Sequence, residues 1–204
     1  MKFYSYVIPR DYGFAPNPYF GYCTLATCKQ GIRKSAHIGD WIGAFGSARM
    51  SIRGRLVSLM LVDEILTFDE YWEDPRFRNK RPIFNKSMMF MYGDNIYHTL
   101  GNKWTQEPSH HSETDGTINY FNLNRDTQTN RVLIATEFYY FGENAINLPV
   151  EFDSLIWRNI GYKTCDDEIL IGSFIEYIHQ HFENGIHGTP YSRRKGAFIY
   201  YGGK

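Results

Sequence analysis

The chain has 204 residues, and its 22 lysines and arginines balance 22 aspartates and glutamates, giving a formal net charge of zero. That length suits one domain with a substantial core, and a neutral chain has no overall field to hold it on nucleic acid or a membrane. No apolar run reaches the roughly 20 residues that span a bilayer, and Pro9 interrupts any signal peptide. We therefore expect a cytoplasmic protein.

Cysteine spacing gives no sign of a disulfide framework or a zinc site. Cys23, Cys28 and Cys165 are odd in number and form no CxxC pair. We expect three reduced thiols, no metal and no cofactor.

The first elements are predicted from alternation and from turn residues. Residues 2–8 alternate with the period of a strand. Residues 9–22 hold three prolines and two glycines and should form a long loop. We expect a short strand within residues 23–29, and a turn or a single helical turn over 30–38.

A tight turn at Gly39 and Asp40 should introduce two neighbouring strands. Glycine adopts positive φ freely, and aspartate bonds its own main chain in turns. Residues 41–45 and 55–66 are apolar runs, which we expect to pair antiparallel because the connection between them is short. Gly43 lies inside the first strand and suggests that a ligand or another backbone approaches there.

The rest of the chain should hold two helices and two strands. The Thr67–Glu70 sequence matches a capping box, so a short helix should follow. Residues 83–130 are polar and should form extended loops with short strands, as an insertion. Residues 131–142 are the clearest strand, and 166–184 show helical spacing of apolar residues. Residues 196–203 could add a last strand.

Basic residues gather in parts of this neutral chain. Six lie between Lys29 and Arg55, against Asp40 alone. Lys29, Arg33 and Arg55 are therefore candidate phosphate contacts, since a basic face with aromatic residues can hold a phosphate backbone. An ordinary solvated surface is the competing interpretation.

Titratable residues gather in the polar middle of the chain. Asp94, His98, His110 and His111 could carry out acid–base chemistry or contact a ligand. Their spacing matches no metal-ligand signature, and plain loop residues remain the alternative.

Two family resemblances follow from the order of these motifs. The Gly-Asp corner, its flanking strands and the helix start over residues 24–82 resemble EVE-type domains of the PUA-like superfamily. The stretch from Asp11 to Ser47, with the later GDNIYH motif, resembles the nucleotide modification associated domain 2 family across most of the chain. Together they imply a single α+β, PUA-like (EVE-like) domain over residues 1–204, built on a curved, mixed or antiparallel, barrel-like sheet with few helices.

The resemblance implies recognition of a modified nucleobase or nucleotide, in a DNA base modification or phage defence system. A flipped base needs stacking faces and edge hydrogen bonds. The candidate base-binding residues are Tyr12, Phe14, Trp41 and Trp104 for stacking, and Asn17, Thr24, Asp94 and Asn95 for the edges. The implied partner is a modified nucleotide or nucleic acid, DNA rather than RNA, with no membrane role.

An enzyme of base or nucleotide modification is the alternative function. It would use Asp94, His98 and His110 or His111 for proton transfer. A subunit with an aromatic interface is a third hypothesis.

Overall fold

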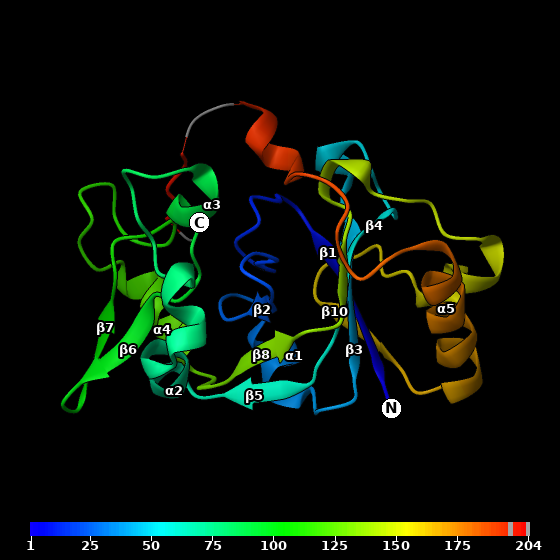
Figure 1. The fold of residues 1–204 in the computed structure, drawn as a ribbon, viewed down its shortest axis with the longest axis horizontal. Coiled ribbons are helices and arrows are strands. Elements are labelled where there is room, and N and C mark those ends of the chain that lie inside the picture. The colour runs from blue at the N-terminus through cyan, green and yellow to red at the C-terminus, as the bar shows by residue number, and fades with distance from the viewer. Residues whose placement is uncertain (196–197, 203–204) are drawn as a thin grey trace. The chain divides into compact units, whose positions relative to one another are not determined.

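The computed structural model describes residues 1–195 and 198–202. Its contacts divide the chain into two compact units (Figure 1). Unit 1 comprises residues 1–12, 36–63 and 135–194, and unit 2 comprises residues 13–35, 64–134 and 195–204.

Unit 1 is built on a six-stranded mixed sheet. In spatial order its strands are β10 (Tyr162–Cys165), β1 (Phe3–Ile8), β3 (Trp41–Gly46), β4 (Leu56–Leu61), β9 (Phe138–Tyr140) and β11 (Gly185–Ile186). The β1–β3 and β9–β11 pairs are parallel, whereas the β1–β10, β3–β4 and β4–β9 pairs are antiparallel. Short 3₁₀ turns complete the unit at Ala48–Met50, Gly142–Asn144, Val150–Leu155 and Tyr191–Lys195.

Helix α5 (Glu168–His181) covers one face of this sheet (Figure 1). Its buried residues Ile171, Phe174, Ile175 and Ile178 recur at helical spacing and join sheet residues in one apolar core. Phe3 meets Phe174 edge to face, with ring centroids 5.5 Å apart. The helix predicted over residues 166–184 is thereby confirmed, because its apolar stripe matches the sheet face that it buries.

The Gly39–Asp40 turn is confirmed, and it anchors β1 and β3. Gly39 has φ +91°, a conformation that glycine adopts without strain. The Asp40 carboxylate accepts hydrogen bonds from the main-chain nitrogens of Lys2 (2.8 Å) and His37 (2.9 Å). One carboxylate therefore fixes both the turn and the start of the neighbouring strand.

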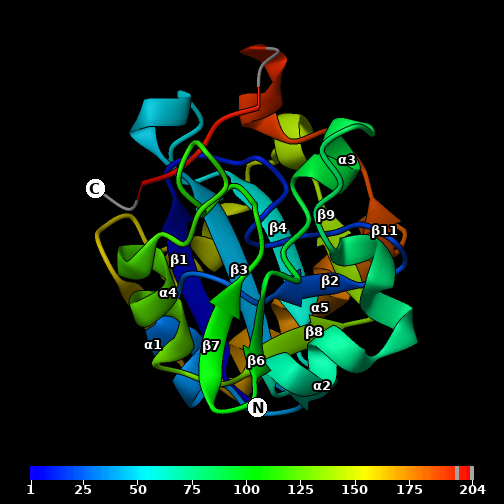
Figure 2. The same ribbon diagram turned by 90° about the vertical axis from the view of Figure 1, so that its left-hand side faces the viewer.

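Unit 2 consists of two small sheets and short helices (Figure 2). The three-stranded sheet has the order β2 (Cys23–Leu25), β8 (Val132–Ala135), β5 (Glu64–Leu66), and β6 (Tyr97–Leu100) pairs with β7 (Lys103–Gln106). Its helices are α1 (Gln30–Ser35), α2 (Phe68–Glu73), the 3₁₀ helix Pro75–Lys80, α3 (Met88–Met91) and α4 (Tyr120–Thr127). The capping box before α2 is confirmed, since Thr67 and Glu70 each bond the other's main-chain nitrogen.

Both long strands predicted from apolar runs are divided between sheets. The predicted antiparallel pairing is confirmed for β3 and β4, but residues 64–66 form β5 in the other sheet. The strand is interrupted after Leu61 because the main chain of Val62 bonds Gly39 and Asp40 of the turn, so the chain continues into the other sheet. The predicted strand over residues 131–142 likewise splits into β8 and β9.

The α+β class with few helices is confirmed, but the barrel-like closure is not. The described strands of the large sheet form an open row with β10 and β11 at its edges. The polar stretch 83–130 holds the expected short strands and also the helices α3 and α4, which the sequence does not predict. Residues 198–202 form no strand, and the remainder of the predicted last strand lies outside the described residues.

Within the described residues, no helix combines the length and the apolar character that crossing a membrane requires.

We predict that Gly43→Ala lowers the free energy of unfolding by about 1–3 kcal/mol, as overpacking does. A Cβ at Gly43 would lie 2.6 Å from the Phe3 ring, so a core side chain is the close neighbour that this strand glycine accommodates. Gly172→Ala in α5 is the matched control: a Cβ there meets open space, and alanine favours a helix. Urea unfolding of both variants tests this, and equal stability of Gly43→Ala and the parent would contradict it.

Candidate active site

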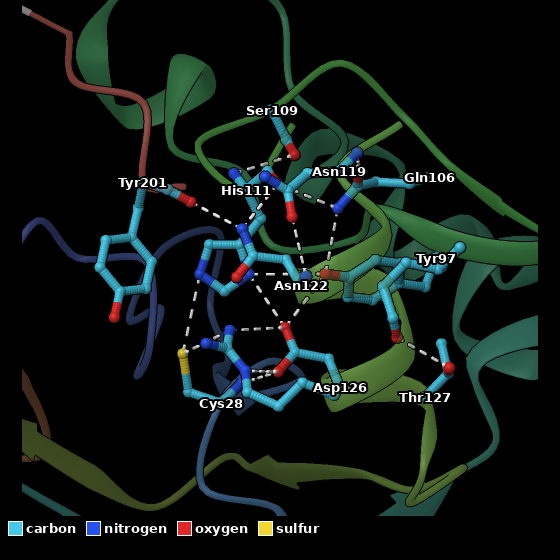
Figure 3. A network of polar contacts seen from close by, with 12 residues as sticks. Cys28, Tyr97, Gln106, Ser109, His111, Asn119, Asn122, Asp126, Thr127 and Tyr201 are labelled. Carbon is cyan, nitrogen blue, oxygen red and sulfur yellow. Dashed lines mark hydrogen bonds and ion pairs between the residues drawn. The ribbon is translucent and has the colours of Figure 1, made fainter. Parts of the chain in front are cut away.

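Three side chains of unit 2 form a Cys–His–Asp cluster, which comprises Cys28, His111 and Asp126 (Figure 3). The Cys28 sulfur lies 3.7 Å from Nε2 of His111. On the other side of the imidazole, Nδ1 lies 2.9 Å from Oδ2 of Asp126. His111 and Asp126 are buried, whereas Cys28 is partly exposed. The order thiol, imidazole, carboxylate is the arrangement by which proteins activate a nucleophile.

The main chain holds Cys28 in an unusual conformation. Cys28 and Lys29 follow β2 and precede α1, and their φ angles are +56° and +43°. Residues other than glycine rarely adopt this region, and such strain gathers at functional sites. The conformation is maintained because Cys28 N donates to Asp126 Oδ1 (3.1 Å) and Cys28 O accepts from Arg33 Nε (2.9 Å).

The buried guanidinium of Arg33 joins the segments that carry the cluster. Besides Cys28 O, it donates to the carbonyl oxygens of Asp126 (2.5 Å), Thr129 (2.7 Å) and Arg131 (2.8 Å). Arg33 is fully buried. The guanidinium therefore fixes the loop before α1 against the end of α4 and the chain entering β8.

His111 is held by its carbonyl oxygen and by an aromatic ring. Its oxygen accepts from Asn122 Nδ2 (2.9 Å) and Gln106 Nε2 (3.1 Å). The Phe14 ring packs against the imidazole with centroids 4.7 Å apart. These contacts fix the ring orientation that places one nitrogen toward sulfur and the other toward carboxylate.

Asp126 has donors for both carboxylate oxygens. Tyr97 OH donates to Oδ2 (3.0 Å), and Arg125 Nε donates to Oδ1 (3.1 Å). Although burial opposes its charge, hydrogen bonds and the charges of His111 and Arg125 hold the pKa of Asp126 well below its usual range. Asp126 is therefore ionised at neutral pH.

The electrostatics of the cluster favour a thiolate–imidazolium pair. Burial by itself would raise the pKa of Cys28, but the charge of His111 and the contact between the two groups lower it below the ordinary thiol value. Burial would lower the pKa of His111, yet the charges and hydrogen bonds of Cys28 and Asp126 raise it to about 9. Such a thiolate is the reactive form of cysteine.

The same three side chains also carry the donor atoms of a possible metal site. One ligand atom from each lies within 4.8 Å of the others. The Arg125 guanidinium, however, is 3.1 Å from Asp126 Oδ1 and 4.0 Å from the Cys28 sulfur. With a second positive charge on His111, the anionic groups are already neutralised, so the arrangement favours a nucleophile over a cation site.

The predicted edge contacts lie together in a different buried network of unit 2. Asp94 accepts hydrogen bonds from Thr24 (2.6 Å) and Tyr71 (2.8 Å), and burial raises its pKa to about 6. Asn17 Oδ1 accepts from the buried Lys80 amine (2.8 Å). Asn95 Nδ2 donates to Tyr71 O (2.9 Å). These four side chains are buried and bonded to protein groups.

The other predicted residues of the polar middle are spread over unit 2. His98 stacks on Trp72 at 4.1 Å and bonds Glu107 at 2.9 Å. Trp104 packs edge to face on Phe68. His110 adjoins the cluster, packing on Phe14 with centroids 5.0 Å apart.

The remaining predicted contacts divide between the two units. Trp41 is a core residue of unit 1, and the main-chain oxygen of Tyr12 accepts from Arg193 Nε at 2.7 Å. Lys29 is partly buried, which lowers its pKa, and Arg55 of unit 1 is exposed. Phosphate contact by Lys29, Arg33 and Arg55 stays a prediction.

The sequence predicts site roles for His111 and Phe14 but none for Cys28 and Asp126. Cys28 was expected to be an ordinary reduced thiol, and its separation of 83 positions along the chain from His111 hides their contact. The polar residues Asn119, Asn122 and Asp126 recur at helical spacing, which is the sequence pattern that could have predicted a buried polar face on this helix.

The chain is thus an α+β protein with a candidate cysteine nucleophile, and it belongs to the nucleotide modification associated domain 2 family, whose model matches residues 1–197. The resemblance to this family that the sequence indicates is confirmed. No curated protein and no solved structure matches the chain. The family's description connects the chain with nucleotide modification and is consistent with contact to nucleotides or nucleic acid.

We predict that Arg33→Lys destabilises the protein by several kcal/mol. A lysine amine keeps the charge but cannot reproduce the planar fork, and each buried carbonyl left unpaired costs about 1–3 kcal/mol. Urea unfolding measures the loss, with the exposed Arg53→Lys as control. A change no larger than that of the control would refute the role of Arg33.

A second prediction concerns acid stability. Because the folded pKa of Asp126 is depressed, its contribution to stability is present above the unfolded value of about 3.9 and is lost as pH falls toward the folded pKa. Asp126→Asn should therefore be much less stable than the parent at neutral pH, and the difference should shrink on acidification. Urea unfolding across that range measures it, with the exposed Asp166→Asn as control; a difference independent of pH would contradict the assignment.

Proposed function

We propose that this chain is a nucleotide-modifying enzyme that works through a covalent intermediate on Cys28. The single observation that carries the proposal is the His111 imidazole, whose two nitrogens face the Cys28 sulfur at 3.7 Å and the Asp126 carboxylate at 2.9 Å. Membership of a nucleotide modification associated family supplies the substrate class.

The reaction class is group transfer at an electrophilic carbon of a nucleotide substrate. The Cys28 thiolate attacks this carbon and forms a C–S bond, and the electron pair of the bond that breaks leaves with the departing group. His111 Nε2 gives its proton to that group. Water or another nucleophile then attacks the same carbon, gives its proton to His111 and displaces the thiolate.

Three surrounding residues position or charge the reacting groups, and they form no bond to the substrate themselves. The Asp126 carboxylate accepts a hydrogen bond from Nδ1–H of His111, so that Nε2 is the nitrogen that exchanges protons with the reacting atoms. Arg125 lies 4.0 Å from the Cys28 sulfur and adds a positive charge that favours the thiolate. Tyr97 holds the carboxylate in place at 3.0 Å.

Recognition of a modified nucleobase without chemistry is the second candidate. Exposed aromatic residues at the start of α4 favour it, since bases stack on such rings. The sequence resemblance of residues 24–82 to EVE-type domains, with the PUA-like fold that it implies, points the same way. If the protein only recognises a base, a variant without Cys28 should still bind its ligand. If it is an enzyme, the same variant should not turn over its substrate.

The pH dependence of Cys28 alkylation by iodoacetamide tests the enzyme proposal. We expect its midpoint below the value of about 8.5 for an ordinary thiol, and we expect His111→Gln to raise it, because the imidazolium stabilises the thiolate. Peptide mass spectrometry resolves Cys28 from Cys165, which lies in β10 and is the internal control. An unshifted midpoint for Cys28, unaltered in His111→Gln, would overturn the proposal.

A further inference from the structure

We propose that Phe121, Arg125 and Tyr201 form a stacking site that holds the nucleobase of the substrate beside Cys28. This inference rests on the proposed function and names the part of the substrate that the protein grips. The three residues come from the first turn of α4, its second turn and the described C-terminal segment.

The start of α4 exposes two large aromatic rings. Tyr120 is 65% and Phe121 is 55% exposed, although the same helix buries Asn122, Leu123 and Asp126. Exposed rings beside a reactive group are a common sign of a binding surface. A planar base can stack on the exposed face of such a ring with little loss of conformational entropy.

Arg125 connects the aromatic surface to the nucleophile. Its guanidinium carbon lies 5.8 Å from the Phe121 ring centre and 5.9 Å from that of Tyr201. Nη2 of the same guanidinium is 4.0 Å from the Cys28 sulfur. Arg125 therefore approaches both the Phe121 ring and the thiol, and arginine itself stacks on bases and bonds their oxygens.

Tyr201 is fixed in position by main-chain hydrogen bonds. Its nitrogen donates to His110 O (2.6 Å), and its oxygen accepts from Asn122 Nδ2 (2.6 Å). Its ring is tilted toward His111, with centroids 5.7 Å apart (Figure 3). The C-terminal segment thus brings a second aromatic ring to the cluster, on the imidazole.

Charge also favours a nucleotide. Cys28 and Asp126 are paired with His111 and Arg125, so the cluster as a whole is neutral, and the nearby Arg33 adds a buried positive charge. A phosphate-bearing ligand meets no net repulsion here. A ring with conjugated carbon–oxygen or carbon–nitrogen bonds is also an electrophile that a thiolate can attack.

Protection of Cys28 from alkylation tests the proposal. The protein is treated with iodoacetamide in the presence of each of the four 2′-deoxynucleoside 5′-monophosphates, and the concentration that halves the alkylation rate is measured. We expect at least one of them to protect Cys28. In Phe121→Ala the required concentration should rise by about 5- to 150-fold, which corresponds to the loss of one stacked base, whereas Phe121→Tyr should retain protection.

Two controls separate the possible outcomes. Ile169→Ala removes a residue that is also highly exposed, on α5 of unit 1, and should not alter protection. 2-Deoxyribose 5-phosphate lacks the base, so any protection by it should be equal in the parent and in Phe121→Ala.

Absence of protection by every nucleotide at millimolar concentrations, or equal protection of Phe121→Ala and the parent, would overturn the stacking site. The alkylation rate without nucleotide and its pH profile report on Cys28 activation alone. Failure of the proposed function is therefore seen separately from failure of this inference.

Discussion

The candidate site depends on one buried guanidinium. Arg33 donates to four main-chain carbonyls, two of which belong to Cys28 and Asp126. A planar group with five N–H donors can satisfy acceptors from several segments at once. The left-handed conformation at Cys28 and Lys29 is strained, and Arg33 with Asp126 supplies the bonds that maintain it. Packing alone would not fix a thiol on such a loop.

Unit 2 buries two sets of charges, and they differ in what surrounds them. The Lys80 amine donates to three oxygens, those of Asn17 O, Asn17 Oδ1 and Tyr22 O. Burial lowers its pKa to about 8 and raises that of Asp94 to about 6. The Lys80 amine and the Asp94 carboxylate each make several hydrogen bonds to protein groups, as the charges of a structural network do. Cys28 is instead partly exposed, and its thiol faces an imidazole and a guanidinium.

Cys23 in β2 and Cys28 in the loop after it have thiol pKa values that are shifted in opposite directions by their surroundings. Burial raises the pKa of Cys23 to about 12, so this thiol stays protonated and packs as a small apolar group. Five residues later, the charge of His111 outweighs burial and lowers the pKa of Cys28. Helix α4 divides in a similar way: its buried face carries Asn122 and Asp126, and its exposed start carries Tyr120 and Phe121.

The sequence by itself determined the elements whose signals are local. The Gly39–Asp40 turn, the capping box at Thr67 and Glu70, and the apolar stripe of α5 depend on neighbours within a few residues, so their patterns predict them. Family membership was also readable, because ordered motifs survive in the chain itself. Tertiary structure decided where β4 ends and β5 begins, since Val62 bonds a turn from elsewhere in the chain. It also decided the site: Cys28, His111 and Asp126 are separated by 83 and 15 residues, and only folding brings a thiol, an imidazole and a carboxylate into one line.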